Sequence, residues 1–167
     1  YNPAGRLPVT FYKATEQLPD FEDYSMQGRT YRYFKGEALF PFGYGLSYTS
    51  FEIGEAQLSK KRIHANEPVN LDLWIKNTGE RDGEEVIQVY IRKLKDKEGP
   101  LKTLRAFKRV HVKSGEKKQI SIHLPNDSFE FFDPEFNVMR VMTGEYEVLY
   151  GTSSEGKDLK KIKVRIQ

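Results

Sequence analysis

Cysteine is absent from the 167-residue chain. Its absence excludes disulfides, thiolate catalysis and Cys-ligated zinc together, although it leaves the compartment open. No apolar run approaches the ~18 residues that a membrane span requires, and no signal peptide is visible. Because residue 1 is tyrosine and not methionine, we expect the chain to be a processed or excised piece of a longer protein.

The chain also lacks a large net charge of either sign. The chain holds 27 Lys and Arg against 24 Asp and Glu, which gives a formal charge of +3. The basic residues are interleaved with acidic ones along most of the sequence, so no stripe suited to tracking a phosphate backbone is evident. The sequence therefore argues against a nucleic-acid partner.

Aromatic residues divide the chain into two parts. Residues 1–48 contain 12 of them, whereas the remaining 119 residues contain 10. Proline and glycine interrupt the first part repeatedly, so we interpret residues 1–48 as an extended connector with one short strand at 7–11. An irregular segment so rich in Tyr and Phe would expose too much apolar surface alone, and we expect it to pack on something.

From residue 49 onward apolar residues alternate with polar ones. Val69, Leu71, Leu73 and Ile75 set the pattern, and five later runs repeat it. Period-two alternation is typical of half-buried strands. Seven or more short strands, separated by turn residues and by no amphipathic helix, predict an all-β fold for residues 49–167: an immunoglobulin-like or fibronectin type III-like antiparallel sandwich.

Few residues are suited to catalysis or to metal binding. His64, His111 and His123 are the only histidines, and we expect His111 and His123 on solvent faces because each lies between core residues. Glu84 and Glu85 are adjacent on a predicted strand and point to opposite faces, so they cannot flank one glycosidic bond. We predict no catalytic residue, no metal site and no cofactor within this chain.

The aromatic segment is the one place where a binding site could form. Sugar-contact candidates are Tyr31, Tyr33, Phe34, Phe42 and Tyr44, whose rings would stack on pyranose faces. The competing interpretation, which the spacing of Gly and Pro favours, is that these rings belong to a strap laid along a neighbouring domain.

Several strings are specific enough to indicate a family. In the first part they are residues 2–11 (NPAGRLPVTF), 28–34 (GRTYRYF) and 40–49 (FPFGYGLSYT). In the second they are 76–79 (KNTG), 83–90 (GEEVIQVY), 104–107 (LRAF), 114–116 (SGE) and 144–146 (GEY). Together they resemble the C-terminal portion of family 3 glycoside hydrolases. The resemblance implies that residues 1–48 are the tail of the second, α/β catalytic domain with its connector, and that residues 49–167 are the fibronectin type III-like domain.

This resemblance implies a parent enzyme that removes terminal sugars by a two-step retaining mechanism. Its Asp nucleophile and Glu acid/base would precede Tyr1, so this chain alone is expected to be inactive and to have the catalytic domains as its partner. The stretches 24–26 and 28–36 resemble the connector of the β-xylosidase branch more than that of the β-glucosidase branch. A periplasmic or extracellular address is implied. The alternatives are an independent module that binds an oligosaccharide, and a fibronectin-like module that binds a protein.

Overall fold

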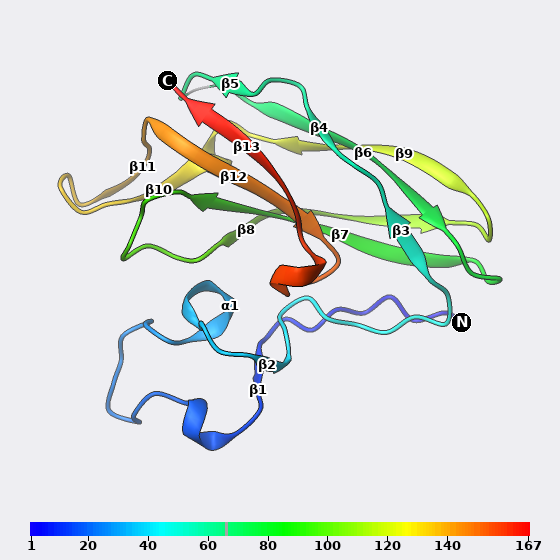
Figure 1. The fold of residues 1–167 in the computed structure, drawn as a ribbon, viewed down its shortest axis with the longest axis horizontal. Helices are drawn as coiled ribbons and strands as arrows, with labels where there is room; N and C mark the ends of the chain where they lie inside the picture. Colours follow the sequence, from blue (N-terminus) through cyan, green and yellow to red (C-terminus); the bar gives the residue numbers. More distant parts are fainter. Residues whose placement is uncertain (66) are drawn as a thin grey trace.

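The computed structural model describes residues 1–65 and 67–167 and consists of a two-sheet β-sandwich with an irregular segment along one face (Figure 1). We call residues 1–48 the strap and residues 49–167 the sandwich. The predicted all-β sandwich is confirmed, and its two sheets hold strands that belong to residues 49–167 alone.

The strap contains little regular structure. Its elements are β1 (Phe11–Tyr12), a 3-10 turn η1 (Thr15–Gln17), a single helical turn α1 (Thr30–Tyr33) and β2 (Ala38–Phe40). The strand predicted at residues 7–11 is wrong, because the strand comprises only Phe11 and Tyr12. Leu7 makes two backbone hydrogen bonds with residues 43 and 44, and Pro8, which has no N–H, cannot continue the ladder.

The larger sheet has the order β5-β13-β12-β7-β8. Its strands are β5 (Arg62–Ile63), β7 (Gly83–Lys93), β8 (Thr103–Val112), β12 (Gly144–Gly151) and β13 (Lys160–Ile166). All pairs are antiparallel except β13 with β5, which is parallel. Between Val89 and Tyr90 the register shifts, so that Arg105 is an extra residue on β8 and forms a β-bulge.

The second sheet is built on β6 (Val69–Asn77). Strands β3 (Phe51–Ile53), β4 (Gln57–Leu58) and β9 (Lys117–Leu124) pair with it antiparallel. A small hairpin of β10 (Glu130–Asp133) and β11 (Val138–Val141) follows the 3-10 turn η2 (Asn126–Phe129), and η3 (Gly156–Asp158) precedes β13. The predicted alternation is confirmed in β6, where Val69, Leu71, Leu73 and Ile75 are all buried.

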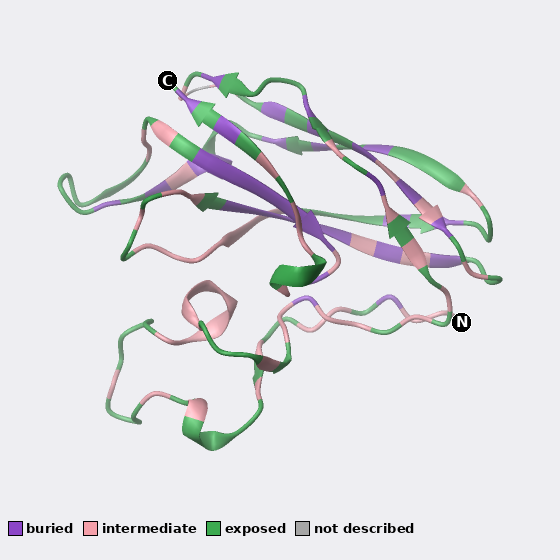
Figure 2. Cartoon of the chain, viewed as in Figure 1, coloured by how far each residue is buried: buried purple, intermediate pink, exposed green. Residues whose placement is uncertain are grey.

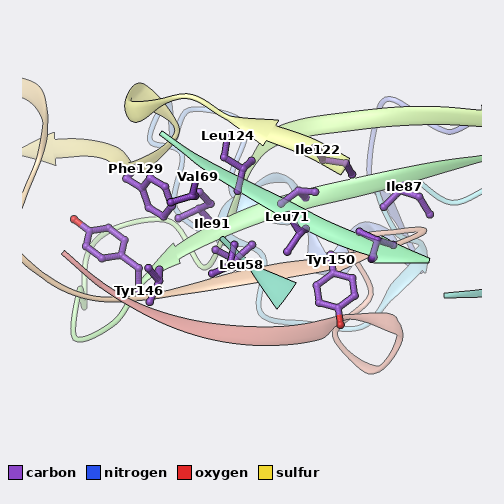
Figure 3. Close-up of a cluster of buried hydrophobic side chains, with 14 of the residues drawn as sticks. Leu58, Val69, Leu71, Ile87, Ile91, Ile122, Leu124, Phe129, Tyr146 and Tyr150 are labelled. Carbon is purple, nitrogen blue, oxygen red and sulfur yellow. The ribbon is translucent and has the colours of Figure 1, made fainter. Parts of the chain in front are cut away.

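The core lies between the two sheets. Leu71 of β6 and Ile87 of β7 belong to one cluster of buried side chains (Figure 3). Leu73 and Ile75 of β6 are members of the same cluster. Figure 2 shows that buried residues are concentrated in the sandwich, whereas the strap is mostly intermediate or exposed. The core cluster draws all its members from residues 58–166, so the sandwich has its own hydrophobic core.

Strand β7 departs from simple alternation. Ile87, Val89 and Ile91 face the core, yet Gln88 and Tyr90 between them are also buried. A strand that is buried on both faces must be covered on both. The strap supplies the second cover, which locates the contact between the two parts of the chain.

Candidate functional site

Gln88 fastens the strap to the sandwich. Its side-chain amide N–H donates to the carbonyl of Gly43, at 3.0 Å, and to that of Thr152, at 2.6 Å. Its Oε1 accepts from the hydroxyl of Tyr90 at 2.5 Å. Gly43 has φ +80°, and a Cβ there would lie 2.0 Å from Gln88 Oε1. Only glycine fits this position, both for its backbone conformation and for the close approach.

An aromatic stack lies beside this contact. Tyr31 of α1 stacks on Phe42, with ring centroids 4.4 Å apart, and meets Tyr90 edge-on at 5.6 Å. The Tyr31 hydroxyl accepts a hydrogen bond from the Leu104 N–H at 3.1 Å. Burial, followed by the nearby Tyr31, raises the pKa of Tyr90 far above its ordinary value. The strap is thus held to β7 by rings that exclude water.

A buried ion pair makes the third connection. Arg6 of the strap pairs with Glu85 of β7, and the two side chains are 9% and 7% exposed. Asn2 adds a hydrogen bond to the carbonyl of Asp82 at 3.0 Å, and its Oδ1 accepts from the N–H of Tyr48 at 2.9 Å. Two distant parts of the strap, near residues 2–6 and 42–48, therefore lie side by side on the same sheet.

The five sugar-contact candidates are spread over different contacts. Among them, within the described residues, only Tyr31 and Phe42 contact each other ring to ring. Phe34 meets Tyr12 edge-on at 4.8 Å, and Tyr44 lies 5.3 Å from Phe40. Tyr33 lines a separate cleft near the loop between β7 and β8. The structure therefore does not gather the five rings into one flat platform.

The strap exposes many large apolar side chains. They are Tyr1, Val9, Phe11, Leu18, Phe21, Tyr24, Met26, Leu39, Phe40, Leu46 and Tyr48. A hollow of about 640 Å³ in the strap is lined by Phe11, Phe40, Tyr44 and Leu46, together with Arg6, Leu7 and smaller residues. An exposed apolar patch of this kind marks an interaction surface.

The two adjacent glutamates of β7 are each paired with an arginine. Glu84 pairs with Arg109, and Glu85 pairs with Arg6. His111 and His123 are exposed on strands, as predicted, and His123 Nδ1 lies 2.9 Å from Asn70 Oδ1. In residues 1–65 and 67–167 no cluster of three or more potential metal ligands occurs. Over the same residues, no helix has the length and apolar character needed to cross a membrane.

Sequence reasoning missed Gln88, Glu85 and Arg6 as the residues that fasten the strap. A signal was present in β7, where the outward-facing positions carry Val86, Gln88 and Tyr90 in place of the usual charged residues. Large or amide side chains in the exposed phase of a strand indicate a second covering layer. The partner of Glu85, 79 residues away in the strap, had no sequence signal.

Comparison with known families assigns both parts of the chain. Residues 1–48 match the family described as the glycosyl hydrolase family 3 C-terminal domain, and residues 85–154 match the fibronectin type III-like domain. The first match ends at the residue where the strap ends.

Individual relatives agree with this assignment. The chain is 54% identical, over 99% of its length, to 19% of a xylan 1,4-beta-xylosidase of Xylanibacter ruminicola. It is 31% identical, over 92% of its length, to 22% of a periplasmic beta-glucosidase of Salmonella typhimurium.

A solved structure agrees too: a β-glucosidase from Erythrobacter marinus superposes with a TM-score of 0.82 at 31% identity, over 99% of this chain and 22% of that one. The chain thus spans about a fifth of the length of these relatives. It belongs to the family 3 glycoside hydrolases and corresponds to their C-terminal part, the end of the C-terminal domain followed by the fibronectin type III-like domain.

Proposed function

We propose that this chain is the accessory, structural portion of an exo-acting β-glycosidase and that the strap is the layer between the sandwich and the catalytic domains. The observation that carries the proposal is that the strap is fixed to the sandwich and still exposes apolar surface. It is held to β7 through Gly43, Arg6 and Tyr31, and it exposes the hollow lined by Phe11 and Phe40. The sandwich then serves as a rigid base that holds the strap in shape for docking.

The reaction proposed for the whole enzyme is hydrolysis of terminal β-linked sugars, with β-xylosides preferred over β-glucosides. Support for the preference is the 54% identity to one xylosidase, against 38% to a β-glucosidase of Kluyveromyces marxianus. For the compartment we propose a periplasmic or extracellular address, supported by the periplasmic relative. The catalytic carboxylates are proposed to lie outside this chain, because Glu84 and Glu85, the adjacent glutamates of β7, each form an ion pair with an arginine.

The test compares the full-length enzyme with the 167-residue chain. Phe11→Ala and Phe40→Ala in the full-length enzyme should speed thermal inactivation, because both rings would lose contacts at the proposed interface. In the isolated chain both rings are exposed, so the same variants should shift the melting temperature little. Phe136→Ala is the matched control, since Phe136 is exposed at the β10–β11 loop, outside the strap.

Two results would contradict the proposal. One is equal inactivation rates for the strap variants and the wild-type full-length enzyme. The other is turnover of aryl β-xyloside or β-glucoside by the isolated chain above the buffer rate, retained through repurification. Either result would mean that the strap is not the layer joining this portion to a separate catalytic unit.

A further inference from the structure

A further cleft, lined in part by the strap, opens beside the loop that joins β7 to β8. It has a volume of about 620 Å³, and its lining residues come from the strap, from that loop and from the β10–β11 hairpin, which lies at one end of the sandwich (Figure 1). A smaller hollow of about 110 Å³ shares Tyr33, Lys93 and Lys95 with it, so the two are continuous. We call them together the loop cleft.

Aromatic side chains line the loop cleft. Tyr33 comes from the strap, whereas Phe131 and Phe132 come from β10. Phe131 is buried in the core, but Phe132 is 53% exposed, so its ring is available to a ligand. Exposed rings in a cleft of this volume suit a flat-faced ligand such as a sugar ring, which packs its C–H face on an aromatic surface.

The charges that line the loop cleft are mostly positive. Five cations, Lys35, Arg92, Lys93, Lys95 and Lys97, face two carboxylates, Asp96 and Glu98. One Asp96 oxygen already accepts the N–H of Gly99, at 2.8 Å. Within the described residues none of the four lysines forms an ion pair, and the Lys93 ammonium only donates to the sulfur of Met142, at 3.2 Å.

Two arginines near these aromatic rings add to the positive charge. Arg32 lies 5.7 Å from the Tyr33 ring, and Arg105 lies 5.5 Å from the Phe131 ring. Among the residues described, neither arginine pairs with a carboxylate, and the Nε of each is buried without a partner. The bulge in β8 directs Arg105 toward β10, where its guanidinium donates to the Glu130 carbonyl.

These arginines are close enough to influence each other. Burial, followed by the charge of Arg32, lowers the pKa of Arg105. Two positive charges that are close together and partly buried are stabilised by a bound anion. A cleft lined by apolar rings strengthens their electrostatic attraction for an anionic ligand. The loop cleft therefore suits a ligand that carries both a negatively charged group and a flat ring face.

We propose that the loop cleft binds an acidic oligosaccharide, meaning a chain of sugar rings with a uronic-acid carboxylate. Tyr33 and Phe132 contact the sugar faces, and Lys95 and Lys97 face the carboxylate. The proposal rests on the proposed function only in taking the ligand to be a carbohydrate. A compact anion would leave the rings unused, and a neutral oligosaccharide would leave the lysines unused.

Calorimetric titration of the 167-residue chain tests this assignment. The probes are a xylo-oligosaccharide with a glucuronic-acid branch, the unbranched xylo-oligosaccharide of equal length, inorganic phosphate and a tetraglutamate peptide. We expect the branched sugar to bind about tenfold more tightly than the unbranched one, as one charge-assisted contact allows. Raising the salt concentration should shrink that preference.

Variants locate the site. Lys95→Ala with Lys97→Ala should remove most of the preference for the acid branch, and Tyr33→Ala should weaken binding of both sugars. Lys163→Ala on β13 and Phe21→Ala in the strap are matched controls, exposed and outside the cleft, and should change neither affinity.

Four outcomes would overturn the proposal: no binding of the branched sugar, equal affinity for both sugars, phosphate or the peptide bound as tightly as the branched sugar, or the controls weakening binding as much as the cleft variants. Hydrolysis of aryl glycosides by the full-length enzyme is measured separately. A failed titration with an active enzyme therefore leaves the proposed function standing.

Discussion

At the residue scale, Asn77 is the most completely bonded polar side chain of the sandwich. Its Oδ1 accepts from Thr49 Oγ1 at 2.7 Å and from the Gly79 N–H at 3.1 Å. Its Nδ2 donates to the carbonyls of Arg81, at 2.7 Å, and Val112, at 3.0 Å. A fully buried amide with every partner in place ties the end of β6 to β8 and to the start of the sandwich.

Substitution of Asn77 should therefore be costly. We expect Asn77→Ala to lower the free energy of unfolding by about 2 to 4 kcal/mol, because several buried groups lose their partners. Asn77→Asp keeps the shape but sets a carboxylate oxygen against two carbonyls, so it should also destabilise. Urea unfolding measures both. Asn70→Ala, on the exposed face of the same strand, is the control, and an Asn77→Ala effect no larger than the control's would contradict the role.

Buried tyrosines predict a loss of stability in alkali. Burial raises the pKa of Tyr146 to about 12, and its hydroxyl donates to the Met142 carbonyl at 2.7 Å. An unfolded tyrosine titrates near pH ~10, so between these values the folded chain keeps a proton that the unfolded chain has lost. The stabilisation is complete below pH ~10 and is lost as the pH rises toward 12.

The size of this loss can be measured by urea unfolding at several pH values from 9 to 11.5. Each such tyrosine should contribute a fall of about 1.4 kcal/mol per pH unit above pH ~10. Tyr146→Phe should reduce the slope by about that amount, while costing a constant amount at neutral pH for the lost hydrogen bond. Identical slopes for the variant and the unmodified chain would show that Tyr146 does not titrate differently on folding.

At the element scale, β7 contacts both the sandwich core and the strap. Ile87, Val89 and Ile91 belong to the sandwich core, whereas Gln88 on the opposite face holds the strap. Because the core cluster lies within residues 58–166, we expect the strap to be an addition to a fold that can form without it. The boundary between residues 48 and 49 is accordingly a proposal that truncation can test.

We expect residues 49–167 to unfold in one cooperative transition without the strap. The whole chain, which exposes the apolar side chains of the strap, should aggregate more readily. Glu85→Gln sharpens the test. In the whole chain it breaks a buried ion pair and should cost roughly 3 kcal/mol, whereas without Arg6 it should be nearly neutral. An unfolded 49–167 chain beside a stable whole chain would show that the strap is part of the core.

At the scale of the whole molecule, the sandwich leaves the sugar undetermined. Only the resemblance of residues 24–26 and 28–36 and the identity to a xylosidase favour one branch of the family. Xylose and glucose differ by a hydroxymethyl group, and pocket discrimination of this size is worth about 1 to 3 kcal/mol. The pocket that makes this choice is proposed to lie outside the chain.

We expect the full-length enzyme to have the higher kcat/KM on aryl β-xyloside. The measurement is steady-state kinetics on the paired xyloside and glucoside with the same leaving group. A preference of tenfold or more for the glucoside would overturn the xylosidase assignment. The family assignment would remain, because it rests on the matches of both parts of the chain.

The sequence was sufficient to predict the sandwich, the strands β6, β7, β8, β9, β12 and β13, the exposed His111 and His123, and the family. These follow from local periodicity and from short strings, which neighbouring residues carry without reference to the rest of the fold. The hairpin of β10 and β11, the faces that are doubly covered, the pairing of Arg6 with Glu85 and the shared cleft of Tyr33 and Phe132 became visible only in the tertiary structure. The last two join residues about 80 to 100 positions apart, and no local pattern records them, because they depend on how the strap and the loops pack on a completed sheet.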